Sequence, residues 1–134
     1  MSKSVLIVED EQSIRDILIE LFETEGTGVE AAATLPAALQ ALSRHVYDLV
    51  VTDIRLGGKW DGGLQVMAAI GLLAPDATVI ALTAYPDDAN RVASQRLGAT
   101  YFLEKPVDLL TIATLASRHG VPTAMLPSEE NGRK

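Results

Sequence analysis

The sequence predicts an α/β fold in which helices cover both faces of a parallel β-sheet. Five short apolar runs alternate with five stretches whose apolar residues recur at helical spacing. The chain is 48% hydrophobic but only 4% aromatic, so its core must be aliphatic, as is common in sheets buried on both faces. An alternation of this kind favours parallel strands joined by right-handed crossovers.

Each predicted strand is a short run of β-branched and other apolar residues. The five runs comprise residues 5–8, 29–33, 49–52, 78–82 and 101–104.

The predicted helices are bounded by residues that favour helix ends. The first covers residues 12–25, and glycines at positions 26 and 28 would end it. Thr34 is a suitable N-cap for the second helix, which would end near His45. The other three helices are predicted from Leu64 to about Pro75, from the Pro86-Asp87-Asp88 segment to Gly98, and from about Asp108 to Arg118.

Length, charge and the lack of cysteine exclude several functional classes. The 134 residues are the size of one ordinary domain. A net charge of −7 argues against direct binding to nucleic acid or to an anionic membrane. The absence of cysteine excludes disulfides and thiolate metal ligands. No apolar run approaches the ~20 residues that span a bilayer, and the start does not resemble a signal peptide, so we expect a soluble cytoplasmic domain.

Polar residues follow four of the five predicted strands. Because the carboxyl ends of parallel strands lie along one edge of a sheet, we expect these residues to converge there. They are Glu9 and Asp10 after the first strand, Asp53 after the third, Thr83 after the fourth and Lys105 after the fifth.

This set of side chains predicts a phosphoryl-transfer site. Converging carboxylates repel one another, and a hard divalent cation such as Mg²⁺ relieves the repulsion. A lysine and a threonine hydroxyl add donors for an anion that also contacts the metal. An aspartate can itself accept the phosphoryl group and form an acyl phosphate.

With these residues in place, the chain resembles a response-regulator receiver domain of two-component signalling. Four motifs carry the resemblance: VED at Glu9 and Asp10, VVTDIRL at Asp53, LTA at Thr83, and FLEKP at Lys105. The resemblance covers residues 3–119 and leaves residues 120–134 as a C-terminal tail or linker. It implies a flavodoxin-like, doubly wound (βα)5 sandwich whose five parallel strands have the order 2-1-3-4-5.

The resemblance also implies a role for each site residue. Asp53 would be the phosphoacceptor, and Lys105 would contact the phosphoryl oxygens. The implied Mg²⁺ ligands are Glu9, Asp10, Asp53 and the backbone carbonyl of Arg55.

Further residues of this family act as a switch. Thr83 would bond a phosphoryl oxygen in the active state, and the switch aromatic three residues before the lysine is Phe102. Tyr101 is adjacent but points to the opposite face by strand alternation. Members of the family usually have a cis peptide bond at the position of Lys105-Pro106.

As a receiver, the chain would be a signalling switch that catalyses only its own phosphorylation and slow dephosphorylation. The phosphoryl donor would be a sensor histidine kinase or a histidine phosphotransfer protein. The face formed by the fourth helix, fifth strand and fifth helix would then change its affinity for a downstream protein or for a missing C-terminal output domain. Homodimerisation is a further possibility.

The loop after Asp53 departs from the family pattern. Gly57 replaces the usual proline, and Asp61 comes one residue later than is common. We expect a mobile loop, and we expect Mg²⁺ or beryllofluoride to change the fluorescence of Trp60 within it. His45 and His119 are interpreted as structural residues near helix C-termini.

Two other functions remain open from the sequence. One is a receiver-like interaction module that signals without phosphorylation, for which the altered loop is the only support. The other is a hydrolase with an aspartyl nucleophile, similar to haloacid-dehalogenase-like phosphatases. That family has a second aspartate two residues after the first, where this chain has Arg55.

Overall fold

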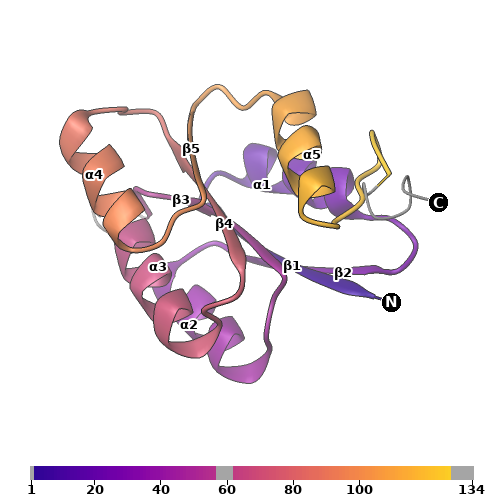
Figure 1. Cartoon of the computed structure of the whole chain (residues 1–134), viewed down its shortest axis with the longest axis horizontal. Helices are drawn as coiled ribbons and strands as arrows, with labels where there is room; N and C mark the ends of the chain where they lie inside the picture. The colour runs from indigo at the N-terminus through magenta and orange to yellow at the C-terminus, as the bar shows by residue number, and fades with distance from the viewer. Residues whose placement is uncertain (1, 57–61, 128–134) are drawn as a thin grey trace.

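The computed structural model describes residues 2–56 and 62–127. Five strands alternate with five helices along them (Figure 1). The elements are β1 (Lys3–Val8), α1 (Gln12–Phe22), β2 (Thr27–Ala32), α2 (Leu35–Arg44), β3 (Leu49–Asp53), α3 (Gly62–Leu73), β4 (Thr78–Thr83), α4 (Asp88–Arg96), β5 (Tyr101–Glu104) and α5 (Leu109–Arg118).

All five strands form one parallel sheet of order β2-β1-β3-β4-β5. The predicted flavodoxin-like fold, with its strand order of 2-1-3-4-5, is therefore confirmed. In this order β2 lies on one side of β1, and β3, β4 and β5 follow one another on the other side. Ligands bind in such sheets beyond the carboxyl ends of the strands, at the point where the order reverses.

Helices cover both faces of the sheet, as expected. α1 and α5 lie on one face, whereas α2, α3 and α4 lie on the other (Figure 1). Successive residues of a strand point to opposite faces, so each strand supplies both cores. Val5 and Ile7 of β1 pack with α1 and α5, while Leu6 and Val8 pack with α2 and α3.

Side chains cap the N-terminal ends of three helices, one of them by the predicted N-cap Thr34. Thr34 accepts a hydrogen bond from the backbone N–H of Ala37 at 3.2 Å, and Asp87 accepts one from Asn90 at 2.7 Å. Asp108 accepts from two backbone N–H groups at the start of α5. A cap of this kind satisfies main-chain donors that the helix itself cannot pair.

Two helix limits differ from the sequence-based expectation. α1 ends at Phe22 rather than at residue 25, because Glu23 is already extended and the chain turns through Gly26, whose φ is +84°. α3 begins at Gly62 rather than at Leu64. Its first turn lies directly against the end of β3, since the Gly63 N–H donates to the Ile54 carbonyl at 2.7 Å. A Cβ on Gly63 would lie 2.0 Å from the carbonyl oxygen of Asp53, so only glycine permits this approach.

The segment after α5 is packed rather than frayed over residues 121–127. Val121 is fully buried, and the Ala124 N–H donates to the Leu21 carbonyl at the end of α1 at 2.7 Å. The Ser117 hydroxyl donates to the Pro127 carbonyl at 2.8 Å. A turn at Gly120, with φ at +81°, brings this segment back onto α1 and α5.

None of the described helices combines the length and the apolar character that a bilayer crossing requires.

Candidate functional site

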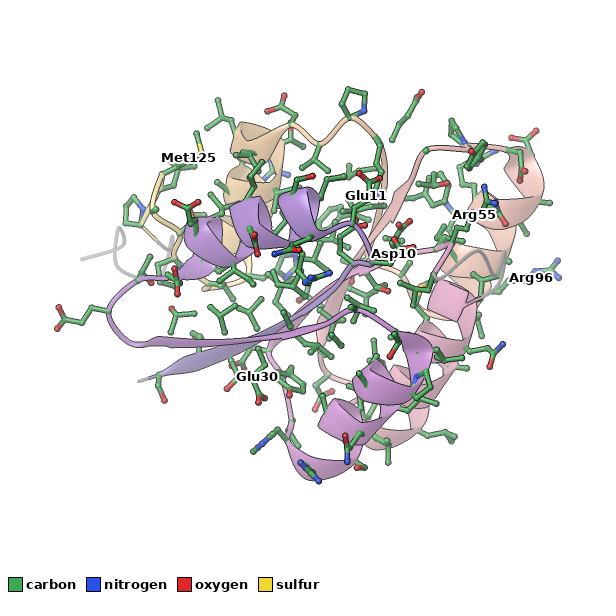
Figure 2. The ribbon with its side chains drawn as sticks, turned by 180° about the vertical axis from the view of Figure 1, so that it is seen from behind. Asp10, Glu11, Glu30, Arg55, Arg96 and Met125 are labelled. Carbon is green, nitrogen blue, oxygen red and sulfur yellow. The ribbon has the colours of Figure 1, made fainter. Side chains whose placement is uncertain are left out.

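The polar residues that follow the strands converge at one edge of the sheet. Asp53 is the last residue of β3 and pairs in register with Leu82 of β4, one residue before Thr83. Thr83 pairs with Glu104 of β5, one residue before Lys105. A cavity of about 310 Å³ opens at this edge; its lining residues are Asp10, Glu11, Asp53, Arg55, Ala84, Tyr85 and Lys105. Figure 2 shows Asp10, Glu11 and Arg55 close together at this end of the molecule.

Three carboxylates form the acidic part of the site. Oxygen atoms of Glu9, Asp10 and Asp53 lie within 4.8 Å of one another. Glu9 and Asp53 are buried, with 0% and 5% of their surface exposed, whereas Asp10 is open to solvent. Like charges this close raise the electrostatic free energy of the ionised site, and a cation between them lowers it.

Lys105 brings a positive charge into contact with two of these carboxylates. Its Nζ lies 2.8 Å from Glu9 Oε1 and 2.9 Å from Asp53 Oδ2. The side chain is only 11% exposed, so these contacts are shielded from solvent. One lysine therefore stabilises two buried carboxylates from two different strands.

The pKa values follow from burial and from these contacts. Burial raises the pKa of both Glu9 and Asp53, and the contacts with Lys105, an ion pair to Glu9 and a hydrogen bond to Asp53, only partly offset that rise. For Lys105, burial alone lowers the pKa, but the bonds to Glu9 and Asp53 outweigh it and leave the pKa raised. Lys105 thus remains a cation at neutral pH, while the two acids lie in an environment that disfavours their charge.

The carboxylates fit a hard divalent cation. Glu9 Oε1 is buried and has no hydrogen-bond partner of suitable geometry within the described residues, although Lys105 lies at ion-pair distance. It therefore keeps acceptor capacity that a metal ion can use. Carboxylate oxygens on a partly open site are the ligands that such cations take in proteins.

Main-chain donors orient two of the carboxylates. Glu9 Oε2 accepts a hydrogen bond from the Glu11 N–H at 3.0 Å, directly before α1. Asp53 Oδ1 accepts a long bond of 3.4 Å from the Arg55 N–H. The guanidinium of Arg55 lies 5.3 Å from the centre of the Tyr85 ring, within the range of a cation–π contact at the cavity wall.

Thr83 and Phe102 are not among the residues that line the cavity. Thr83 is 2% exposed, and its hydroxyl oxygen accepts from the Tyr85 N–H at 2.9 Å. Phe102 is half-buried and packs against the core under α2 and α3. Tyr101 packs on the other face, as predicted, and its hydroxyl lies 2.8 Å from His119 Nε2.

The remaining predicted positions are placed as follows. The Lys105-Pro106 peptide bond is cis. His45 and His119 occupy the C-caps of α2 and α5 and do not line the cavity. Gly57, Trp60 and Asp61 lie outside the described residues.

Sequence reasoning missed three residues that shape the site. They are Gly63, which allows α3 to touch the end of β3, Tyr85 on the cavity wall, and Arg15, which bonds the turn that carries Glu9 and Asp10. Tyr85 lies two residues after a strand end, which is the one positional signal that could have identified it.

This chain is similar to known response regulators. A sequence profile of the response regulator receiver domain matches residues 5–117. The response regulator protein FleR of Pseudomonas aeruginosa is 32% identical over 98% of this chain, and the photosynthetic apparatus regulatory protein RegA of Rhodobacter capsulatus is 33% identical over 96%. The chain spans only 27% of FleR but 68% of RegA.

Solved structures show the same fold at similar identity. A CheY-like receiver domain protein from Methanospirillum hungatei superposes with a TM-score of 0.79 at 30% identity, over 86% of this chain and 90% of that one. A response regulator from Burkholderia pseudomallei, solved with a phosphorylated aspartic acid, a calcium ion and citrate, has a TM-score of 0.76, also at 30% identity. The match covers 86% of this chain and 65% of the Burkholderia chain.

Proposed function

This chain belongs to the response regulator receiver domain family, and on that premise we propose that it is a phosphorylation-driven switch whose phosphoacceptor is Asp53. One observation carries the proposal. Asp53 is a buried carboxylate at a strand end that faces an open cavity, with two further carboxylates within 4.8 Å and a lysine nitrogen at 2.9 Å. The family is a signalling module rather than a catalytic enzyme, so the hydrolase alternative is set aside.

In the proposed reaction an oxygen of Asp53 attacks the phosphorus of a phosphohistidine. A new O–P bond forms as the N–P bond breaks, and the histidine nitrogen leaves with the bonding pair and takes up a proton. Lys105 already lies 2.9 Å from Asp53 Oδ2, so a small movement brings it to an oxygen of the transferred group. Its positive charge offsets the negative charge that the phosphoryl group adds beside two other acids.

Mg²⁺ is the cation that we propose for the acidic cluster, with Glu9, Asp10, Asp53 and the backbone carbonyl of Arg55 as ligands. When bound, it neutralises charge on the carboxylates and on the phosphoryl oxygens. The Burkholderia relative was solved with a calcium ion, which has the same preference for oxygen ligands.

The proposed switch couples the site to the β4–β5 side of the sheet. Thr83 would turn its hydroxyl to a phosphoryl oxygen, and Phe102 would move into the space behind it. The face formed by α4, β5 and α5 would then change its affinity for a partner. Phe102 has no hydroxyl, so its movement is driven by packing alone.

Partners follow from the family and from the lengths of its members. We propose a sensor histidine kinase or a histidine phosphotransfer protein as the phosphoryl donor, in the cytoplasm. The output is a downstream protein or a C-terminal output domain, since FleR and RegA are longer than this chain. Residues 3–119 would form the receiver and residues 120–134 the tail or linker, and the domain would not bind nucleic acid directly.

Acetyl phosphate, a small phosphoryl donor, tests the proposal without a kinase. With Mg²⁺ present, the wild type should gain one phosphoryl group by intact-protein mass spectrometry, and Asp53→Asn should gain none. Addition of EDTA should abolish the reaction of the wild type. Modification that persists in Asp53→Asn would defeat the assignment of Asp53.

The alternative of a phosphorylation-independent module rests only on the loop that contains Gly57. Beryllofluoride with Mg²⁺ mimics the acyl phosphate and separates the two functions. A phosphorylation-driven switch should show changed NMR signals at Thr83 and Phe102, whereas an independent module should show no change at either residue.

A further inference from the structure

Arg15 contacts the turn that connects β1 to α1. The residue lies in the first half of α1, and its side chain is half-buried. Nη1 donates a hydrogen bond to the backbone carbonyl of Glu9 at 3.0 Å and a longer one to that of Asp10 at 3.4 Å. The guanidinium therefore bonds the main chain of both acids that the site takes from this turn.

These two carbonyl groups lie outside the hydrogen-bond ladder of α1. Glu11 is the N-cap residue, and its own carbonyl accepts the first helical bond, from the Arg15 N–H at 2.9 Å. The carbonyls of Glu9 and Asp10 precede it in the chain. The side chain of Arg15 therefore connects the turn to α1 through its two hydrogen bonds.

The turn needs such a tie because it is strongly acidic. Glu9, Asp10 and Glu11 are consecutive, and the first two hold carboxylate oxygens within 4.8 Å of Asp53. Mutual repulsion drives these side chains apart when no metal ion is bound.

We propose that Arg15 is a positioning residue for the metal site. By holding the carbonyls of Glu9 and Asp10, it keeps their carboxylates near Asp53 before the cation arrives. This inference rests on the proposed function of the acidic cluster. Residues that orient metal ligands in this way commonly change metal affinity by 10–100-fold when they are replaced.

Three variants separate this role from a general effect of charge. Arg15→Met keeps the unbranched stem and removes the guanidinium, and Arg15→Lys keeps the charge on a shorter, single-nitrogen head group. Arg44→Met is the matched control, since it removes the same charge from the last residue of α2, which precedes β3 at the opposite edge of the sheet. None of the three substitutions alters a residue of the acidic cluster or Lys105.

The decisive measurement is a Mg²⁺ titration of the unphosphorylated protein followed by NMR. We expect the dissociation constant to rise about tenfold in Arg15→Met, to rise less in Arg15→Lys, and to stay unchanged in Arg44→Met. The Glu11 N–H donates a hydrogen bond to Glu9 Oε2. In the metal-free protein, this amide hydrogen should exchange with solvent faster in Arg15→Met than in the wild type.

A purely structural role gives a different result. If Arg15 only stabilises α1, its loss lowers the melting temperature and speeds amide exchange along the whole helix, but folded Arg15→Met binds Mg²⁺ as tightly as the wild type. That outcome overturns the inference and leaves the proposed function intact. A wild type that binds no Mg²⁺ would overturn both.

Discussion

Two aspartates at opposite ends of the same strand illustrate how this fold separates stability from function. Asp48 directly precedes β3, is exposed, and accepts a hydrogen bond from the Ser4 N–H at 2.8 Å. Its backbone bonds both neighbouring strands, to the Ser4 carbonyl at 2.8 Å and from the Thr78 N–H at 2.9 Å. Asp53 ends the same strand, is buried, and faces Lys105 and two other carboxylates.

The difference lies in what each carboxylate faces. Asp48 accepts a hydrogen bond from the main chain of β1, and this bond stabilises the fold. Asp53 faces side-chain charges in a buried place, and burial raises its pKa. Its ionised form therefore lowers the stability of the metal-free fold, which is typical of residues retained for function.

The largest effect should follow from loss of the cation at the functional end. Lys105→Met removes the cation that contacts both buried carboxylates, Glu9 and Asp53, and we expect about 3 kcal/mol of destabilisation in metal-free protein. Urea denaturation measures it. Mg²⁺ should restore part of the loss, because it supplies the missing positive charge.

A double variant checks that interpretation. Glu9→Gln combined with Lys105→Met should lose less stability than the sum of the two single changes. The reason is that Glu9→Gln removes the negative charge whose ion pair Lys105→Met would otherwise break. Additive losses would show that Lys105 stabilises the fold through contacts other than its ion pair with Glu9.

At the other end of the strand, Asp48→Ala should cost about 1 kcal/mol, since the Ser4 N–H loses its side-chain acceptor. Mg²⁺ affinity and modification by acetyl phosphate should stay at the wild-type level. Thermal denaturation and the Mg²⁺ titration measure the two effects. A loss of Mg²⁺ binding in this variant would contradict the separation of the two strand ends.

The smallest effect that we expect is a dependence on pH that distinguishes Asp53→Asn from the wild type. The pKa values of Asp53 and Glu9 are raised above their usual 3.8 and 4.5, so their contribution to stability is fully present below those values. It is lost as the pH rises through the raised values. Lys105 is protonated throughout this range and contributes no slope, because its pKa is raised above 10.5.

Melting curves without Mg²⁺ test this dependence. From about pH 4 to neutrality, the wild type should lose stability relative to Asp53→Asn, whose amide does not ionise. Saturating Mg²⁺ should remove the difference in slope. A wild type that gains stability relative to the variant over this range would show that the pKa of Asp53 is lowered rather than raised.

The parallel sheet and the convergence of the polar residues could be predicted from periodicity, whereas the strand order was implied by the resemblance to the receiver family. Alternating strands and helices imply a parallel sheet, and a parallel sheet brings Asp53 and Lys105 to one edge. Individual side-chain and main-chain contacts between helices and the sheet have no periodicity in the sequence from which they could be predicted. The approach of Gly63 to Asp53 and the bond from Arg15 to Glu9 depend on how α3 and α1 are set against the sheet.

The C-terminal segment shows the same limit. Nothing in its two prolines and the polar residues after them predicts that Val121 is buried or that Ala124 bonds the end of α1. A single apolar residue after a helix carries no periodicity, so its burial could not be predicted from the sequence.

The position of the phosphoryl group is the most direct test of the account. The wild type is treated with acetyl phosphate and Mg²⁺ and then with borohydride, which reduces an aspartyl phosphate to homoserine, and peptides are mapped by mass spectrometry. We predict homoserine at position 53, none at positions 10 or 48, and none anywhere when Mg²⁺ is withheld. Homoserine at another position, or equal modification without Mg²⁺, would contradict the central claim.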